Sequence, residues 1–332
     1  MVANVALVTG ATGGLGQVLT SVLLAQGRSV IATGRNKEAG DLLERKGARF
    51  IRADLAEDDL SGLVAEADTV FHLAALSSPW GDYNDFVAAN ITATKRLLAA
   101  ARQAQCRRFI FTSSPSIYTC AKHQIGLTED SALPLNPVNA YAQTKLAAEQ
   151  AVLASAAPDF QTVALRPRAI ISPYDSVLLP RLLQAAKSGF LPLPGWGNAL
   201  IEPTDARDVA SALLAAEACA GEAIGRVFNI SGGHPVPLKS FVRYVFKKMN
   251  RKVRLMPVPS LLALGVASLM ERVAMLSDAE VEPKLTRYSA MVLGYSQTFD
   301  LSRAARVLHW APHYKAFDAI DWALEERFYA VD

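Results

Sequence analysis

A glycine-rich turn that directly follows an apolar run is the feature of this chain that most constrains its fold. The run covers residues 5–8, and the turn reads Gly10-Ala-Thr-Gly13-Gly14-Leu-Gly16. Glycines permit a tight turn and a close approach of a ligand to the backbone, and the N-terminus of a helix attracts a pyrophosphate. A strand, such a turn and a helix in succession predict a dinucleotide-binding unit. The expected cofactor contacts in the turn are Gly10, Thr12, Gly13, Gly14, Leu15 and Gly16.

Short apolar runs and longer amphipathic segments alternate through the first half of the chain. This alternation predicts an α/β fold, a Rossmann-like doubly wound parallel sheet with helices on both faces. Strands are expected at residues 5–8, 29–33, 48–52, 68–73, 108–112 and 162–166. Helices are expected after Gly13 and at residues 85–105 and 140–155.

The alternation of apolar runs and amphipathic segments becomes less regular after Pro167, where prolines become frequent. We therefore expect residues 1–167 to form the nucleotide-binding domain, which also carries the catalytic residues. Residues 168–332 are expected to form mainly a smaller substrate-binding lobe. Within that half, the segments around residues 204–232 have the pattern of sheet and helix elements that return to the main domain.

Composition and charge narrow the possible partners. The chain has 332 residues, of which 51% are hydrophobic, and a net charge of +3, which suits a globular protein. Its basic residues are scattered, so we expect no nucleic-acid partner. The three cysteines and five histidines lack metal-ligand spacing, and we expect no metal and reduced thiols. With no secretory signal pattern at the N-terminus, a cytoplasmic location is expected.

One almost uncharged stretch, residues 258–270, reads VPSLLALGVASLM and is followed by Glu271 and Arg272. It falls well short of the ~20 residues that span a bilayer. We expect either a helix buried in the protein core or a lid over the substrate, in preference to a segment that contacts a membrane. Membrane contact through residues 258–270 remains the alternative.

The residues after the second strand indicate which nucleotide binds. Many NAD sites carry a carboxylate there for the ribose 2′-hydroxyl, whereas this chain reads Thr33-Gly34-Arg35-Asn36-Lys37. Arg35 can pair with a 2′-phosphate or stack on the adenine, so we expect NADP(H) to be preferred over NAD(H). Asp54 and Leu55 follow the third strand and Ala74 follows the fourth, at turns that fit the adenine and a ribose.

Tyr141 and Lys145 fall on one face of the helix expected at residues 140–155, because they are four residues apart. An ammonium beside a phenol favours the phenolate, and a phenol tuned towards neutral pH is a general acid or base for a carbonyl and alcohol pair. The fifth strand runs into Ser113 and Ser114. That placement predicts hydroxyl groups at the carboxyl edge of the sheet, where α/β proteins bind ligands.

With these features the chain resembles the extended short-chain dehydrogenases/reductases, the NAD-dependent epimerase/dehydratase superfamily. The matching residues, in family order, are Gly10, Gly13, Gly16, Asp54-Leu55, residues 72–75, Asn90, residues 112–114, Tyr141, Lys145 and Arg166-Pro167. The resemblance implies that Ser114 holds the substrate oxygen and that Tyr141 transfers the proton. It implies that Lys145 binds the nicotinamide ribose and lowers the tyrosine pKa. It also implies cofactor contact at Pro167 and a homodimer through the helices at residues 85–105 and 140–155.

The choice of Ser114 over Ser113 also depends on the resemblance. Family members place the active serine four residues before the aromatic of a V-Y-like pair, which is Tyr118 here. The sequence departs from the family at Thr119-Cys120, where many relatives have a glycine, so this loop is expected to differ. Asn90 is expected to organise a helix or a water rather than to contact the substrate.

Residues in the second half of the chain distinguish between the substrate classes that this family accepts. Sugar-nucleotide enzymes often carry an arginine seven residues before a late aspartate, and alignment of Asp208 with that motif puts Ile201 there. Residues 163–168, 178–182 and 283–300 resemble the 3β-hydroxysteroid dehydrogenase-like branch and the bacterial 2-alkyl-3-oxoalkanoate reductases. Trp80 and Tyr83 are expected on the substrate side with Ser114, either against an acyl chain or rings or as plain packing residues.

These features predict an NADP(H)-dependent oxidoreductase that acts on a small apolar substrate. It would reduce a ketone of that substrate or oxidise the corresponding secondary alcohol. A β-keto acyl, steroid-like or aromatic ketone would fit. One alternative is a sugar-nucleotide epimerase or dehydratase that retains NAD. A second is a non-catalytic nucleotide-sensing protein, which would have no use for the complete set of Ser114, Tyr141 and Lys145.

Overall fold

Seven parallel strands form one central sheet in the computed structural model, which describes residues 5–175, 177–219, 222–277 and 281–329. The strands are β1 (Val5–Thr9), β2 (Ser29–Gly34), β3 (Arg49–Arg52), β4 (Thr69–His72), β5 (Arg108–Thr112), β7 (Gln161–Pro167) and β12 (Arg226–Ile230). Their order across the sheet is β3-β2-β1-β4-β5-β7-β12. The order reverses between β1 and β4, which is where doubly wound sheets bind their ligands. The α/β fold class and the six expected strands are confirmed.

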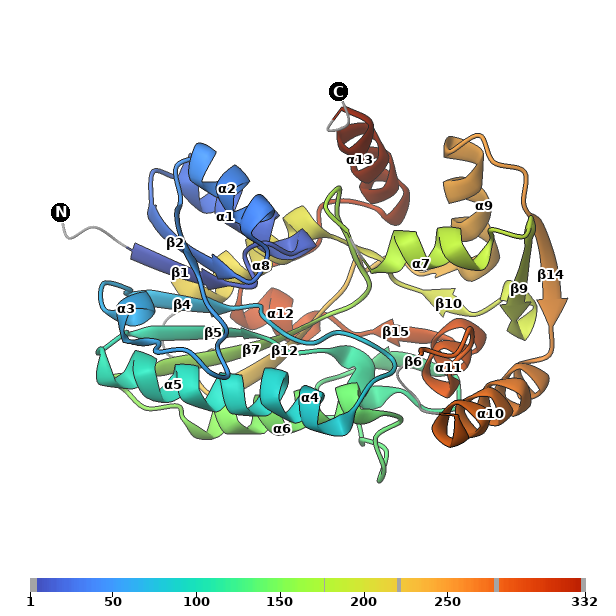
Figure 1. The fold of residues 1–332 in the computed structure, drawn as a ribbon, viewed down its shortest axis with the longest axis horizontal. Coiled ribbons are helices and arrows are strands. Elements are labelled where there is room, and N and C mark those ends of the chain that lie inside the picture. The colour runs from blue at the N-terminus through green and yellow to red at the C-terminus, as the bar shows by residue number, and fades with distance from the viewer. Residues whose placement is uncertain (1–4, 176, 220–221, 278–280, 330–332) are drawn as a thin grey trace.

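Helices cover both faces of this sheet (Figure 1). One face carries α1 (Gly14–Ala25), α2 (Lys37–Arg45) and α8 (Ala206–Ala218). The opposite face carries α3 (Ser61–Val64), α5 (Ala93–Gln103) and α6 (Ala140–Ala154). Each face buries its own apolar cluster, around Leu19 and Leu213 on the first and around Leu97 and Val152 on the second. The sheet is therefore held in place from both sides, and its carboxyl edge is a fixed platform for a site.

The helix expected at residues 85–105 changes its winding along its length. It begins as α4 (Tyr83–Phe86), passes through a π-helical turn, η1 (Val87–Thr92), and continues as α5. A π-turn carries an extra residue within a helix and often lies near functional sites. Here it holds the buried Asn90, whose Oδ1 accepts a hydrogen bond of 2.8 Å from the amide of Leu76, in the loop after β4.

The second half of the chain builds most of the lobe at the right of Figure 1. Its core lies between α7 (Leu178–Ala185), α9 (Leu238–Lys248) and α13 (Ala316–Tyr329). Short strands pair within it and contribute to that core: β8 (Ile170–Ile171) with β11 (Thr204–Asp205), β9 (Phe190–Pro194) with β14 (Arg254–Val258), and β10 (Leu200–Ile201) with β13 (Val236–Pro237). From the first half, β6 (Gln124–Leu127) pairs with β15 (Gln297–Phe299), and from the second half β12 joins the main sheet.

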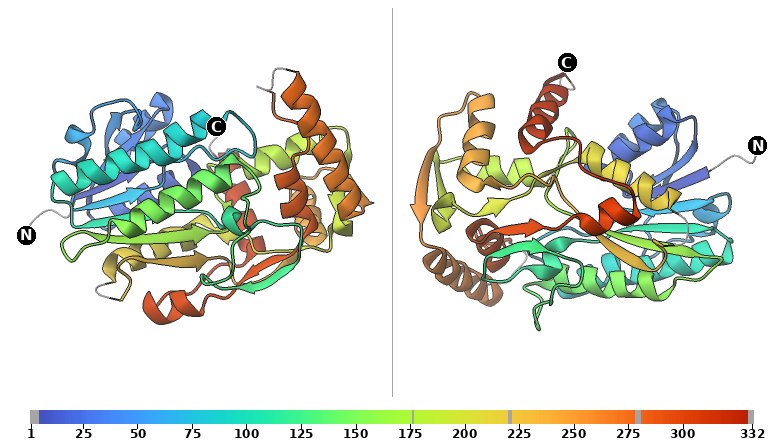
Figure 2. Two further views of the ribbon diagram at one scale, coloured as in Figure 1. Left: turned by 90° about the horizontal axis from the view of Figure 1, so that it is seen from below. Right: turned by 180° about the vertical axis from the view of Figure 1, so that it is seen from behind.

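The apolar stretch at residues 258–270 lies mostly in α10 (Ser260–Leu276), on the outside of the lobe beside α11 (Arg287–Gly294) (Figures 1 and 2). Ala263 and Ala267 are buried against α11, whereas Leu261 is 79% exposed and Leu269 is 63% exposed. The alternative of a core helix is therefore wrong, because Ala263 and Ala267 are the buried residues of α10, with Leu264 partly buried beside them. Within the described part of the chain, no helix combines the length and the apolar character needed to cross a membrane.

Candidate active site

The glycine turn after β1 brings three segments into contact. Gly10 has a φ of 64°, and a Cβ at this position would lie 2.8 Å from the backbone nitrogen of Ala74. A Cβ on Gly16 would lie 2.2 Å from the carbonyl oxygen of Gly10. These two glycines therefore allow the turn, the first turn of α1 and the loop after β4 to pack at a distance that no other residue permits.

The start of α1 offers donors to an anionic ligand. Gly13 precedes α1 without a side-chain cap, and its carbonyl accepts the first intrahelical bond, from the amide of Gln17 at 3.0 Å. The amides of Gly14, Leu15 and Gly16 therefore have no acceptor within the helix, and the helix dipole adds positive potential. A pyrophosphate suits this donor set, so the residues present fit a dinucleotide. The Leu15 side chain itself packs in the core.

The end of β2 faces the glycine turn, because a Cβ on Gly34 would lie 2.5 Å from Oγ1 of Thr12. Arg35 follows, with a side chain that is 73% exposed and an Nη1 atom 3.8 Å from Oδ2 of Asp54. Nε of Arg52 donates a hydrogen bond of 3.1 Å to the carbonyl of Arg35. A second guanidinium, which the sequence patterns did not single out, therefore stands at this edge beside Arg35.

Three further predicted cofactor residues, Ala74, Leu55 and Pro167, lie at or just after the carboxyl ends of strands in the main sheet. Ala74 lies at the turn after β4, and its amide donates to Oγ1 of Thr9 at 3.2 Å. Leu55 follows the carboxyl end of β3, with its side chain buried among the apolar residues of the second face and its carbonyl accepting from Arg96 at 3.1 Å. Pro167 is the last residue of β7, at the carboxyl edge of the sheet.

His72, on β4, is a structural residue that joins β1 to the first turn of α5. Its Nδ1 lies 2.7 Å from Oγ1 of Thr9, and its Nε2 lies 2.9 Å from Oγ1 of Thr94. Thr94 donates its own proton to the carbonyl of Asn90, so His72 donates from Nε2 and accepts at Nδ1. Burial lowers the pKa of His72 to about 3, and the charge of Lys145 acts in the same direction. The ring is therefore neutral.

Tyr141 and Lys145 lie one turn apart on α6, whose first turn is capped by Asn139. Lys145 is only 2% exposed, and its Nζ donates a hydrogen bond of 2.6 Å to the carbonyl of Thr112, the last residue of β5. Burial lowers the pKa of Lys145 to about 7, against the opposing effect of Glu149. The ammonium is therefore held where β5 ends, beside the segment that continues into the serines.

The two serines after β5 are held in different ways. Ser113 donates its hydroxyl proton to Oε2 of Glu149 at 2.6 Å. Ser114 begins the short helix η2 (Pro115–Tyr118), and its Oγ accepts from the amide of Ser116 at 3.2 Å. Within the described residues no acceptor takes the hydroxyl proton of Ser114, so this proton is available to a ligand oxygen. The geometry favours Ser114 over Ser113 as the hydroxyl that meets a substrate.

A buried ion pair beneath these residues joins α6 to β7. Arg166, the residue before Pro167, donates from Nε to Oε2 of Glu149 at 2.8 Å and from Nη1 to the hydroxyl of Tyr118. The arginine and the carboxylate are both almost fully buried. Sequence reasoning noted Arg166 only as part of a family motif. The sequence does give one indication of its partner: Glu149 lies one helical turn beyond Lys145, on the same face of α6.

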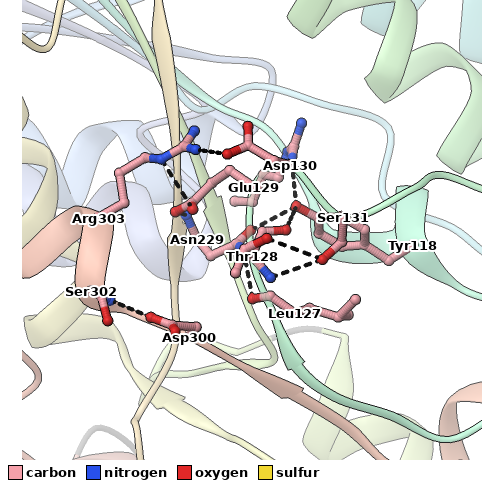
Figure 3. Close-up of polar contacts among 11 residues, drawn as sticks. Tyr118, Leu127, Thr128, Glu129, Asp130, Ser131, Asn229, Asp300, Ser302 and Arg303 are labelled. Carbon is pink, nitrogen blue, oxygen red and sulfur yellow. Dashed lines mark hydrogen bonds and ion pairs between the residues drawn. The ribbon is translucent and has the colours of Figure 1, made fainter.

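The same polar network continues towards the last strand of the sheet, as Figure 3 shows. The Tyr118 hydroxyl lies 3.1 Å from Oδ1 of Asn229, on β12, to which it donates. The amide of Asn229 donates to Oε1 of Glu129 at 2.8 Å, and Arg303 pairs with that carboxylate at 3.4 Å. A fully satisfied buried network fixes the elements that it joins. It therefore holds η2, and with it Ser114, against the sheet.

Trp80 and Tyr83, which are expected from the sequence near the substrate, lie in the loop after β4 and at the start of α4. The loop with Trp80 is attached to the start of α6, because Nδ2 of Asn139 donates to the carbonyl of Pro79 at 3.3 Å. Trp80 is half-buried, and Tyr83 is 45% exposed. Tyr288, on α11, was not predicted. Burial raises the pKa of Tyr288 to about 12.

Several known proteins are similar to this chain along most of its length. A model of the "NAD dependent epimerase/dehydratase family" matches residues 6–231. The 2-alkyl-3-oxoalkanoate reductase of Stenotrophomonas maltophilia (strain K279a) is 35% identical over 312 residues, which cover 92% of this chain and 94% of that protein. The 4-hydroxy-2-methyl-3-oxo-4-farnesyl-3,4-dihydroquinoline-1-oxide ketoreductase of Stigmatella aurantiaca is 32% identical over 318 residues, 94% of each chain.

Among solved structures, that of MoeE5 in complex with UDP-glucose and NAD superposes with a TM-score of 0.77. The two chains are 26% identical, and the match covers 98% of this chain and 99% of the other. The likeness therefore extends over both the sheet and the lobe.

Proposed function

Because the chain belongs to the NAD-dependent epimerase/dehydratase family of extended short-chain dehydrogenases/reductases, we propose that it uses NADPH to reduce the ketone of an apolar 3-oxo compound. The family makes it an NAD(P)-dependent oxidoreductase. The substrate class follows the relatives whose names describe ketone reduction, the 2-alkyl-3-oxoalkanoate reductase above all. The same groups serve the reverse reaction, oxidation of the 3-hydroxy compound.

The observation that carries the proposal is the hydrogen bond of 2.6 Å from Lys145 to Thr112. It fixes α6 against the end of β5, so Tyr141 and Ser114 stand on adjoining elements at the same edge of the sheet. Lys145 also lies one helical turn from Tyr141 on α6. A general acid, a hydrogen-bond donor and a cation together are what the reduction of a carbonyl requires.

Each residue then has a distinct role. A bound nicotinamide supplies the hydride. Ser114 gives its unused hydroxyl proton as a hydrogen bond to the carbonyl oxygen, where negative charge develops. Tyr141 transfers its proton to that oxygen. Lys145, when protonated, favours the phenolate that this transfer leaves and binds a ribose hydroxyl.

Preference for NADPH over NADH is part of the proposal. It is supported by Arg35 and Arg52, which stand together at the end of β2 and β3. A 2′-phosphate pairs well with a guanidinium fork. Asp54 is the carboxylate that lies near Arg35, at 3.8 Å, and both side chains are too exposed for this contact to hold the arginine firmly.

A second candidate is a sugar-nucleotide epimerase or dehydratase. The structural likeness to MoeE5 with its UDP-glucose favours it. Against it, Ile201 stands at the position where such enzymes often carry an arginine, and its side chain is buried in the apolar core of the lobe. The two ketone reductases, at 35% and 32% identity, are also more similar to this chain in sequence than MoeE5 is, at 26%.

An NADPH-oxidation screen distinguishes the two. The panel contains β-keto acyl compounds, ketosteroids, aromatic ketones, and UDP- and GDP-sugars. We expect NADPH consumption with the β-keto acyl compounds and none with the sugars. Purification with tightly bound NAD, together with conversion of a nucleotide sugar without net NADPH consumption, would establish the epimerase instead.

A further inference from the structure

The helix α10 exposes an apolar stripe at the outer end of the lobe. Five large side chains recur along it at spacings of four and three residues and so lie on one face of the helix: Leu262, Val266, Leu269, Val273 and Leu276. Their exposed fractions run from 43% for Val266 to 88% for Leu276. Single exposed apolar residues are ordinary, but a continuous apolar stripe marks an interaction surface.

The charges on α10 are few and do not provide for a partner helix. Its buried side packs Ala263 and Ala267 against α11. Its one carboxylate is engaged there too, because Oε1 of Glu271 accepts from the amide of Arg287 at 2.6 Å. In paired helices, charged residues usually flank the apolar seam and select the partner. Here Arg272 is the other charged residue of α10, so the stripe has almost no such selecting charges.

An exposed tryptophan lies beside the start of α10. Trp196 is 55% exposed and has a φ of 60°, a left-handed conformation that is uncommon for a residue other than glycine. A Cβ on the preceding Gly195 would lie 2.6 Å from the carbonyl oxygen of Gly294 and 3.0 Å from Oγ of Ser260. These two residues are the end of α11 and the start of α10. Tryptophan favours the boundary between water and lipid, because its ring is apolar and its N–H is polar.

A basic groove opens at the same outer end of the lobe. It lies where α9 ends and where β9 and β14 begin, and it has a volume of about 700 Å³. Its lining includes the exposed cations Arg243, Lys247, Arg251, Lys252 and Arg254. The carboxylate of Asp321, near the end of α9, is already engaged by Lys248 at 2.8 Å. The groove therefore presents a cluster of positive charges to a ligand from outside.

The strand β14 connects the groove to α10. It runs from Arg254, in the groove, to Val258, two residues before α10. Figures 1 and 2 show α9, β14 and α10 along one outer end of the lobe. In the pairing of β14 with β9, Arg254 stands beside Phe190 and Met256 beside Pro192. Phe190 is 45% exposed and Met256 is 39% exposed, so apolar surface continues from the groove towards the stripe.

Apolar surface and positive charge together select the partner. An anionic membrane offers an acyl boundary to the stripe and phosphate headgroups to the cations. Stable attachment to a membrane surface generally needs two such signals, one apolar and one basic. With 17 residues, α10 is shorter than the ~20 residues of a spanning helix. It would therefore lie in the plane of the membrane surface.

We propose that the outer end of the lobe docks the protein on an anionic lipid surface. The α10 stripe and Trp196 would enter the headgroup boundary, and the cations of the basic groove would bind lipid phosphates. Of the interpretations of residues 258–270, the proposal selects membrane contact. It does not rest on the proposed reaction, because Ser114, Tyr141 and Lys145 have no part in this surface.

The test is sedimentation of the full-length protein with lipid vesicles. Mixed vesicles of phosphatidylcholine and phosphatidylglycerol should bind it at least about 10-fold more tightly than phosphatidylcholine alone, because several cations each favour the anionic surface. High salt should weaken this binding. Arg251→Gln combined with Lys252→Gln should weaken it by about 30-fold, and Leu269→Gln by about 10-fold, the effects of two surface charges and of one buried leucine.

The control variants make the same exchanges on the main domain. Leu42→Gln, on α2, matches Leu269→Gln, and Arg45→Gln combined with Arg226→Gln matches the loss of two charges. All three residues are exposed, and these variants should bind vesicles as the wild type does. Tryptophan fluorescence gives a second readout. The emission of the wild type should shift to shorter wavelength with mixed vesicles, and Trp196→Phe should lose most of that shift.

Two results would overturn the proposal. One is the absence of sedimentation with mixed vesicles. The other is equal binding by the wild type, Leu269→Gln and the variant lacking Arg251 and Lys252, with circular dichroism showing folded proteins. Light scattering identifies the competing occupant: a dimer that Leu269→Gln converts to a monomer, without vesicle binding, would assign the stripe to a second copy of the chain. None of these measurements needs turnover, so they stand whether or not the proposed reaction is found.

Discussion

The hydroxyl of Ser113 donates a hydrogen bond of 2.6 Å to the buried carboxylate of Glu149. The bond commits the proton of this serine to a carboxylate that also receives the guanidinium of Arg166. Its neighbour Ser114 has no such commitment, since its oxygen accepts from the amide of Ser116. Two adjacent serines therefore have separate roles, one in holding α6 to the sheet and one in meeting a substrate.

This division predicts opposite effects for two alanine substitutions. Ser114→Ala should lower kcat by about 10²-fold to 10³-fold, the effect of losing one donor to a developing oxyanion, with little change in stability. Ser113→Ala should leave kcat nearly unchanged but lower the free energy of unfolding by about 1–3 kcal/mol, because it removes a donor from a buried carboxylate. Steady-state kinetics and urea unfolding measure the two effects. The reverse pattern would assign the substrate contact to Ser113.

Arg35→Ala should weaken NADPH binding while NADH binding is unchanged. Loss of a hydrogen-bonded charge contact costs about 1.5–3 kcal/mol, equivalent to about 10-fold to 150-fold in Kd. Fluorescence titration with each nucleotide measures this difference. Arg49→Ala is the matched control, since Arg49 is an exposed arginine on β3 that pairs with Glu66 at 2.9 Å. Equal losses for both nucleotides, or for both variants, would contradict recognition of the 2′-phosphate by Arg35.

Acid should destabilise the fold through His72. Burial lowers the pKa of this residue from 6.5 to about 3, so between these values the unfolded chain binds a proton that the folded chain does not. The free energy of unfolding should therefore fall as pH drops from 6.5 towards 3, with His72 contributing at most about 1.4 kcal/mol per pH unit.

The measurement is urea unfolding of the wild type and of His72→Gln across this pH range. The variant can still hydrogen-bond to the neighbouring threonines but does not titrate, so its stability should depend less on pH. Parallel curves for the two proteins would show that His72 is not buried as a neutral ring.

The parts of the structure that could be predicted are those encoded by neighbouring residues. Gly10 and Gly16 indicate a tight strand–turn–helix unit because any side chain there meets backbone. Tyr141 and Lys145 fall on one face of a helix by spacing alone. Such local patterns specify both the strands of the sheet and the elements that carry the candidate catalytic residues.

The remaining features depend on contacts between distant segments, which no local pattern records. Arg243 and Arg254 come from α9 and β14, and only the fold shows that they line one groove. Glu149 and Arg166 lie 17 residues apart on successive elements, and their pairing follows from the packing of α6 on β7. The apolar composition of α10 is compatible with both a core helix and a lid, so its exposure could not be predicted from composition. The small residues Ala263 and Ala267 were the sign that only one narrow face packs.

The central claim is that Tyr141 transfers a proton to a 3-oxo substrate at a nicotinamide site. Its most direct test is the single-turnover rate of NADPH oxidation with a β-keto acyl substrate, measured for wild type and Tyr141→Phe alongside NADPH affinity. Loss of a general acid typically costs about 10²-fold to 10⁴-fold in rate, so we expect a loss of at least that size in Tyr141→Phe with NADPH affinity nearly intact. A variant that turns over the substrate at the wild-type rate would contradict the account.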